Sequence, residues 1–272
     1  MYIMQNNSLL VSVIMNCHNG STYLHEAIDS VYSQTYNNWE IIFWDNASTD
    51  DSVNIVKNYD NKIKYFRCEK KIPLYHARNK AINECNGQIV TFLDCDDVWN
   101  NEKLSLQLEL FKKGYKFIYG RYELMDENGV AINKKIHKLK FGKVTNNLLV
   151  KNFISIGTVM IDTHLLKKFM FNPRFNLIGD FDLWVRVSFE IEFNFVNTIV
   201  EKSRQHNGNL SSHLKNDWIL EQRILYREYL KKYGLSKLLF ILVFILRSEI
   251  KFVLDKILLV LRDYIKIFIT IL

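Results

Sequence analysis

Residues 9–20 read LLVSVIMNCHNG, and this stretch decides the fold class. Its first part, Leu9–Met15, is a continuous apolar run rich in β-branched side chains, which is typical of a strand buried on both faces of a parallel sheet. The run stops at the polar turn Asn16–Gly20, and apolar residues at helical spacing follow that turn. A strand, a turn and a helix in this order predict the first unit of an α/β fold.

The same pattern recurs within the first hundred residues. Trp39–Trp44 (WEIIFW) and Ile89–Leu93 (IVTFL) predict two more strands, and each runs directly into a polar cluster. We therefore predict one α/β domain over residues 1–230 with a doubly wound, mostly parallel sheet. In such sheets ligands bind outside the carboxyl ends of the strands. The polar clusters at these ends are residues 16–19, 45–50 and 94–97.

The later elements have less regular patterns. Lys116–Met125 and Ser155–Ile161 predict strands, and Gly179–Phe189 has helical spacing with acidic residues at its start. Trp99–Leu110 is a candidate helix directly after the third polar cluster.

Three carboxylates, Asp94, Asp96 and Asp97, follow the strand at 89–93 at once. Carboxylates this close repel one another unless a cation or hydrogen-bond donors compensate them. Mn²⁺ or Mg²⁺ meets that need, because such hard ions take oxygen ligands and bind one or two protein carboxylates together with substrate phosphates. The alternative is that these residues cap the candidate helix at 99–110. Their position at the ligand edge of the sheet favours the metal site.

The formal net charge is +7, and the lysines gather where acidic residues are missing. Between Asn128 and Ile161 there is no Asp or Glu, but there are several lysines. This stretch is either a solvated surface loop or a basic surface that attracts a phosphate-bearing partner such as anionic lipid or a lipid diphosphate. It has no interleaved stacking aromatics of a nucleic-acid module, so we expect no nucleic-acid partner.

Residues 231–272 predict a second unit, an amphipathic helical tail. Its longest uncharged stretch, Leu238–Leu246, is too short to span a bilayer, which needs about 20 apolar residues. If Leu235–Leu272 is helical, the charged residues of this part fall within an arc of roughly 200°, and the opposite face is apolar. We expect the tail to lie on a membrane surface. Covering the protein's own core, or the seam of a homodimer, is the alternative.

The four cysteines form no CxxC pair, and the first residues lack the charged start and long apolar run of a signal peptide. Both features indicate free thiols in a reducing cytoplasm. Together with the tail they predict a cytoplasmic protein that is peripherally associated with the cytoplasmic face of a membrane.

Four segments stand in a recognisable order along residues 10–210. They are VSVIMNCHNGSTYLHEAIDSVYSQTYNNWEIIFWDNASTDDS, HARNKAI, GQIVTFLDCDDVW and IGDFDLWVRVSF. In this order they resemble the inverting family 2 glycosyltransferases with the GT-A fold. The resemblance implies a GT-A nucleotide-binding domain that moves one sugar from a nucleotide-diphosphate sugar, with a UDP-sugar as first choice. The implied acceptor is a hydroxyl of a lipid-linked or cell-surface glycan precursor.

The resemblance also assigns the nucleoside site. The matching positions are Asn16, His18, Asn19, Asp45 and Asn46. The family often has a second carboxylate, which reads uracil, where Asn46 stands, although an amide oxygen can also accept a hydrogen bond from uracil. It often has Thr-Tyr where this chain has Cys17 and His18, so we assign His18 to binding only.

The remaining matches carry the chemistry. Arg78 would lie near the base or diphosphate, Asp94 would contact ribose or metal, and Asp96 would be the chief metal ligand. Asp180 matches the catalytic base, and His206 would face the diphosphate or the metal.

The physical mechanism requires two kinds of group. A metal neutralises the charge that develops on the leaving diphosphate, and a carboxylate takes the proton of the attacking hydroxyl. Asp180 is the predicted base, and we expect its rival Asp182 to position Arg186 four residues later.

Two other functions are alternatives. A sugar nucleotidylyltransferase would carry a glycine-rich loop after its first strand, where this chain has only Gly20. A catalytically inactive scaffold that binds nucleotide sugars at the membrane would have little reason to keep Asp94, Asp96 and Asp180, because grouped charges without a ligand are costly.

Overall fold

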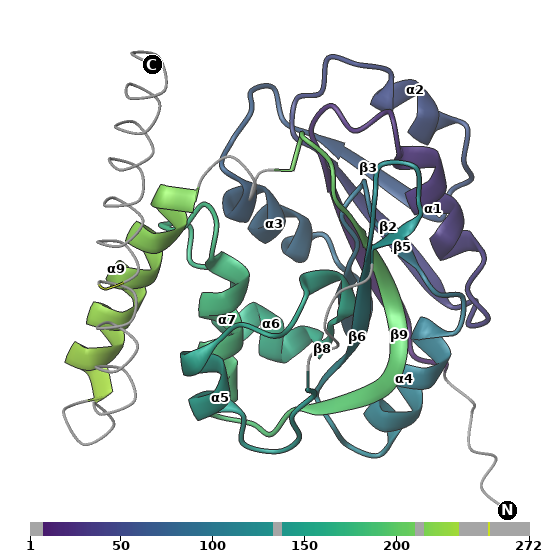
Figure 1. The fold of residues 1–272 in the computed structure, drawn as a ribbon. Helices are drawn as coiled ribbons and strands as arrows, with labels where there is room; N and C mark the ends of the chain where they lie inside the picture. The colour runs from purple at the N-terminus through teal and green to yellow at the C-terminus, as the bar shows by residue number, and fades with distance from the viewer. Residues whose placement is uncertain (1–7, 133–137, 210–214, 234–249, 251–272) are drawn as a thin grey trace, which may run out of the picture.

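The computed structural model of the chain describes residues 8–132, 138–209, 215–233 and 250. Its nine strands are β1 (Val11–Cys17), β2 (Trp39–Asp45), β3 (Ile63–Arg67), β4 (Ile89–Phe92), β5 (Val98–Trp99), β6 (Phe117–Met125), β7 (Ala131–Ile132), β8 (Met160–Asp162) and β9 (Asn194–Arg204). They form one sheet in the order β3-β2-β1-β4-β8-β6-β9-β5, with β7 beside β6 (Figure 1). The α/β fold class predicted from the sequence is confirmed.

The first four strands pair in parallel, as the apolar runs predicted. Every residue of β1 and β2 is buried, so both faces of these strands lie under other elements. Beyond β4 the sheet is mixed, because β8 runs antiparallel to both β4 and β6, whereas β6 and β9 pair in parallel. The short β5 joins the edge antiparallel to β9.

Helices cover both faces of the sheet. They are α1 (Leu24–Tyr32), α2 (Ser52–Lys57), α3 (Leu74–Asn83), α4 (Lys103–Lys112), α5 (Thr145–Val150), the 3-10 turn η1 (Ile156–Thr158), α6 (Thr163–Phe169), α7 (Gly179–Ser188) and α9 (Lys215–Tyr233). Helices α1, α2 and α4 lie on one side and α3, α5, α6 and α7 on the other, with α9 outside α7 (Figure 1). The two buried apolar clusters correspond to these two faces.

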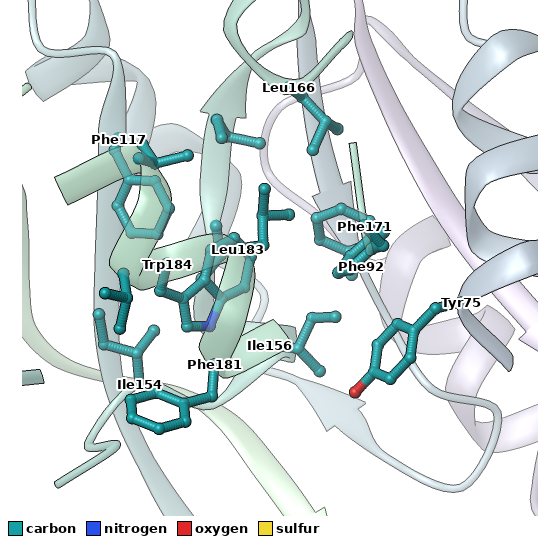
Figure 2. Close-up of a cluster of buried hydrophobic side chains, with 14 of the residues drawn as sticks. Tyr75, Phe92, Phe117, Ile154, Ile156, Leu166, Phe171, Phe181, Leu183 and Trp184 are labelled. Atoms are coloured by element: carbon teal, nitrogen blue, oxygen red, sulfur yellow. The ribbon is translucent and has the colours of Figure 1, made fainter. Parts of the chain in front are cut away.

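Helix α7 is anchored by aromatic packing. Trp184 is completely buried and meets Phe117 of β6 edge-on, with ring centroids 5.0 Å apart (Figure 2). Burying an indole of this size fixes the rotation of the helix about its axis, because the apolar area removed from water is large and the contact geometry is specific. The acidic first turn of α7 is thereby placed at the ligand edge of the sheet.

Two local predictions were wrong. Residues 155–161 form η1 followed by β8 rather than one strand, since the hydroxyl of Thr158 donates to the Ser155 carbonyl at 2.7 Å and the chain turns there. The helix after the acidic cluster begins at Lys103, and Trp99 lies in β5. The carboxylates at 94–97 therefore do not cap that helix.

Helix α9 runs across the predicted domain boundary at residue 230. Its Leu225 and Tyr226 are completely buried in the cluster that also contains Trp184, so α9 belongs to the core of the domain. The predicted tail lies outside the described residues except for 231–233 and 250. Within the described residues no helix is both long enough and apolar enough to cross a membrane.

Candidate active site

A pocket of about 680 Å³ opens at the carboxyl ends of β1 and β4. Its volume is in the range of about 300–1,000 Å³ that is typical of small-molecule sites. The start of α3 and the segment before α7 complete its walls. The predicted site residues that line it are Asn16, His18, Asn46, Arg78, Asp94, Asp96 and Asp180.

Arg78 holds Asp94. The guanidinium Nη2 donates to Asp94 Oδ1 at 2.6 Å, and the arginine side chain is 5% exposed. The cation also lies over the Tyr75 ring, 5.5 Å from its centroid. A buried arginine in this setting fixes Asp94 at the pocket wall and contributes positive charge to the pocket.

Asp96 lies beside His206. The two side chains are joined by a contact of 3.0 Å between His206 Nε2 and Asp96 Oδ2. Burial and the negative charge of Asp94 raise the pKa of the Asp96 carboxyl, and His206 partly offsets this. Two carboxylates at one pocket wall, one of them destabilised by burial and by the other's charge, fit a divalent cation, which would relieve both effects.

The described residues contain no group of three or more His, Cys, Asp or Glu side chains that could hold a metal ion by themselves. Mg²⁺ and Mn²⁺ commonly bind one or two carboxylates and take their remaining ligands from phosphates and water. Asp96 and Asp94 match that donor set.

Asp180 stands in the first turn of α7 and faces the same pocket. Its Oδ1 accepts from its neighbour, the Phe181 N–H, at 2.7 Å and from the Tyr75 hydroxyl at 3.3 Å. Burial raises the pKa of the Asp180 carboxyl, and the Arg78 charge opposes that rise. Asp182 instead pairs with Arg186 at 2.8 Å, as predicted from their spacing.

Of the residues predicted to bind the nucleoside, Asn16 has no hydrogen-bond partner for its amide among the described residues, whereas His18 and Asn46 bond to the backbone of the pocket wall. Asn16 is 9% exposed and lines the pocket, and both polar atoms of its amide group are buried without a hydrogen-bond partner among the described residues. His18 contacts the Asn46 carbonyl through Nδ1 at 3.0 Å. Asn46 bonds the backbone of Ile72 twice, donating at 2.7 Å and accepting at 3.0 Å, so its amide shapes the pocket wall.

Three predicted residues lie outside the pocket lining, and one of them, His206, contacts the lining residue Asp96. The other two are Asp45 and Asn19. Asp45 is completely buried, accepts from Tyr65 at 2.7 Å and pairs with Arg67, so the prediction that it contacts the donor does not agree with the structure. Asn19 is exposed, and its side-chain oxygen accepts from the Thr49 N–H at 2.8 Å. Both side chains support the turn at 46–50 rather than the pocket surface.

The sequence patterns missed two residues that support the site. Arg204 is 1% exposed, and its Nε donates to the Asp96 carbonyl at 2.9 Å while its N–H donates to Asp97 Oδ1 at 2.7 Å. Tyr75 lies three residues before Arg78, so helical spacing could have placed both on one face of α3. Arg204 had no such signal, because it comes from β9, far along the chain.

Comparisons with known proteins agree with this geometry. The sequence model of the family described as "Glycosyl transferase family 2" matches residues 12–169. The chain is 33% identical over 218 residues to the UDP-Glc:alpha-D-GlcNAc-diphosphoundecaprenol beta-1,3-glucosyltransferase WfgD of Escherichia coli, covering 77% of this chain and 84% of that relative.

Two solved structures have a similar fold. TarS of S. aureus in complex with UDP-GlcNAc has a TM-score of 0.67 at 20% identity, over 82% of this chain and 67% of that one. The mannosyltransferase PcManGT of Pyrobaculum calidifontis, in complex with GDP-Man and Mn²⁺, has a TM-score of 0.65 at 15% identity, over 83% of this chain and 65% of that one. At these identities the likeness shows the fold alone.

Proposed function

Because this chain belongs to glycosyl transferase family 2 and is a glycosyltransferase of the GT-A fold, we propose that it transfers one sugar from a UDP-sugar to a hydroxyl of a lipid-linked glycan precursor, with inversion at the anomeric carbon. The relative from Escherichia coli supports both substrates, since its name gives UDP-Glc as donor and a diphosphoundecaprenol-linked sugar as acceptor.

The observation that carries the proposal is the meeting of three carboxylates in one pocket. Asp94 and Asp96 follow β4, whereas Asp180 lies in the first turn of α7, and all three line the same cavity. A sugar transferase needs one acidic group at the leaving diphosphate, through a cation, and another at the acceptor hydroxyl. The pocket supplies both from separate walls.

Asp180 is the group that we assign to the acceptor. Its Oδ1 is already engaged by Phe181 and Tyr75, so we assign its Oδ2 to the acceptor hydroxyl. Because burial raises the pKa of this carboxyl, it takes up a proton more readily than an exposed aspartate does. The nearby Arg78 charge opposes this rise in pKa and favours the ionised form of the carboxyl.

Asp96 and Asp94 would hold Mn²⁺ or Mg²⁺, which when bound supplies positive charge that stabilises the leaving diphosphate. His206 orients Asp96 from one side, and Arg78 fixes Asp94 from the other. Asn16, whose amide has no partner among the described residues, is assigned to the nucleoside.

We further propose that the predicted tail, residues 231–272, places the enzyme at the cytoplasmic face of a membrane, where a lipid-linked acceptor resides. The support is the amphipathic pattern of the sequence and the lipid-linked acceptor in the relative's name. Removing the tail would then release the protein from anionic vesicles, and unchanged vesicle binding would contradict this part of the proposal.

The decisive experiment is a calorimetric titration with UDP, GDP, dTDP and CDP, each with and without Mn²⁺. We expect metal-dependent binding of UDP, loss of that binding in Asp96→Asn, and retained binding without turnover in Asp180→Asn. Turnover is followed as release of UDP from UDP-sugars with a lipid-diphosphate-linked acceptor. No metal-dependent diphosphate binding, or full turnover in Asp180→Asn, would refute the proposal, and binding without any transfer by the wild-type chain would indicate a scaffold.

A further inference from the structure

Three consecutive backbone N–H groups point at one carboxylate from a distant helix. Glu221 of α9 accepts from Asn176 at 2.7 Å through Oε1, and from Leu177 at 2.9 Å and Ile178 at 3.1 Å through Oε2. These three residues form the segment directly before α7, which begins at Gly179 and carries Asp180.

The start of α7 needs such an acceptor. The first N–H groups of a helix have no partners within the helix, and the N-cap residue Ile178 offers no side-chain hydrogen bond. A carboxylate near a helix N-terminus is favoured by the helix dipole, and hydrogen bonds to an ionised acceptor are stronger than neutral ones. Glu221 accepts from the N–H of the N-cap residue Ile178 and from the two N–H groups before it, so it holds the backbone at the point where the chain enters α7.

The same segment shapes the pocket. Asn176 and Leu177 both line it, and the Leu177 carbonyl accepts from the Tyr75 hydroxyl at 3.3 Å. That hydroxyl also bonds Asp180. A methyl group on Gly179 would stand 2.6 Å from the Tyr75 ring, so the backbone lies directly against the ring. A displacement of the 176–178 segment would therefore displace Asp180.

We infer that Glu221 is a positioning residue for the transfer reaction, which holds the 176–178 segment so that Asp180 reaches the acceptor hydroxyl. This inference rests on the proposed function. Buried Leu225 and Tyr226 anchor α9 to the core, so the carboxylate has a rigid support. Helix α9 lies beyond the family match at 12–169 and stands outside α7 (Figure 1).

The test compares Glu221→Ala and Glu221→Gln with Glu228→Gln. Glu228 is on the same helix and pairs with the Arg174 side chain at the surface, where it is 43% exposed, so it is a matched control without contact to the backbone of 176–178. Three quantities are measured for each variant: amide hydrogen exchange in a peptide that covers 174–178, the dissociation constant for UDP with Mn²⁺, and kcat.

For Glu221→Ala we expect faster exchange at 176–178, a kcat about 10- to 100-fold lower, and a UDP dissociation constant within about twofold of wild type. Glu221→Gln keeps one acceptor oxygen, so its exchange rate at 176–178 and its kcat should lie between those of Glu221→Ala and wild type. Glu228→Gln should match wild type in both quantities.

Unchanged exchange in Glu221→Ala would overturn the inference, whatever the protein's substrate. Faster exchange with wild-type kcat would also overturn it, because the segment would then be held for stability alone. If the wild-type chain turned over no nucleotide sugar, the proposed function would fail. The exchange measurement would still decide whether Glu221 holds the segment.

Discussion

Replacing Lys103 by methionine should remove a pH dependence of stability that a buried amine creates. Lys103 on α4 is completely buried beneath the sheet, and its Nζ donates to Thr91 at 2.9 Å and to Gln107 at 2.7 Å. Burial lowers the pKa of this amine to about 7 from its ordinary value of 10.5. The difference corresponds to about 5 kcal/mol of unfavourable free energy when the amine is charged in the folded state.

The sign of the effect follows from which state binds the proton. Below pH 7 both states are protonated, so the full cost is present. Between pH 7 and 10.5 the unfolded chain binds more protons than the folded one, so the free energy of unfolding rises with pH. From about pH 7.5 to about pH 9.5 the free energy of unfolding of the wild-type chain should rise by about 2–3 kcal/mol.

Urea unfolding of both proteins across this range measures the effect, because their difference cancels the other titrating groups. Near pH 7.5 we expect Lys103→Met to be about 1–3 kcal/mol more stable than wild type. The substitution removes the free-energy cost of the buried charge, and this gain is larger than the cost of leaving the Gln107 side-chain oxygen without its hydrogen bond. The advantage should shrink as pH rises. The charge of Lys103 also lowers the pKa of Glu201. Without that charge the pKa of Glu201 rises further, so the Lys103→Met variant loses stability as pH rises, and this also shrinks its advantage over wild type.

The matched control is Lys112→Met, an exposed lysine on the same helix, whose stability difference from wild type should not change with pH. Parallel curves for wild type and Lys103→Met would refute the reasoning. They would mean that the buried amine stays fully charged in the folded state, with a pKa near its unfolded value.

Three further predictions concern Asp180. Arg78→Met removes the charge that lowers the pKa of Asp180, so the acid limb of the kcat/KM profile should move to higher pH; an unmoved limb would exclude Asp180 as the titrating base. Tyr75→Phe removes a hydrogen bond that also lowers this pKa, and we expect a smaller shift of the same sign and a kcat about 2- to 10-fold lower, measured in the same profile. Gly179→Ala should lower kcat about 10- to 100-fold, because the added methyl group would stand 2.6 Å from the Tyr75 ring and displace Asp180. Metal-dependent UDP binding, measured by calorimetry on the same sample, should be retained. A kcat at the wild-type value in steady-state kinetics would contradict this prediction.

The parallel half of the sheet and most of the candidate site were predictable, because both depend on local patterns. An apolar run such as 11–15 has to be covered on both faces, and the polar residues after such strands collect at one edge. Asp94, Asp96 and Asn16 line the pocket for this reason. The antiparallel β8 was not predictable in the same way, since its three residues follow a turn whose shape depends on hydrogen bonds within 155–158.

The sequence alone determined the spacing of apolar residues that marks the strands and helices, the acidic cluster after β4 and the order of the family motifs. Each strand, helix or motif is set by residues close together in the chain. Only the tertiary structure separated Asp45 from Asp94, although each follows a buried strand. Arg67 from β3 and Tyr65 cover Asp45, whereas Asp94 meets Arg78 at the pocket wall. It also brought Glu221 to the start of α7. Whether a charge is buried, paired or open to a ligand depends on which distant elements pack against it, and a local pattern carries no information about that packing.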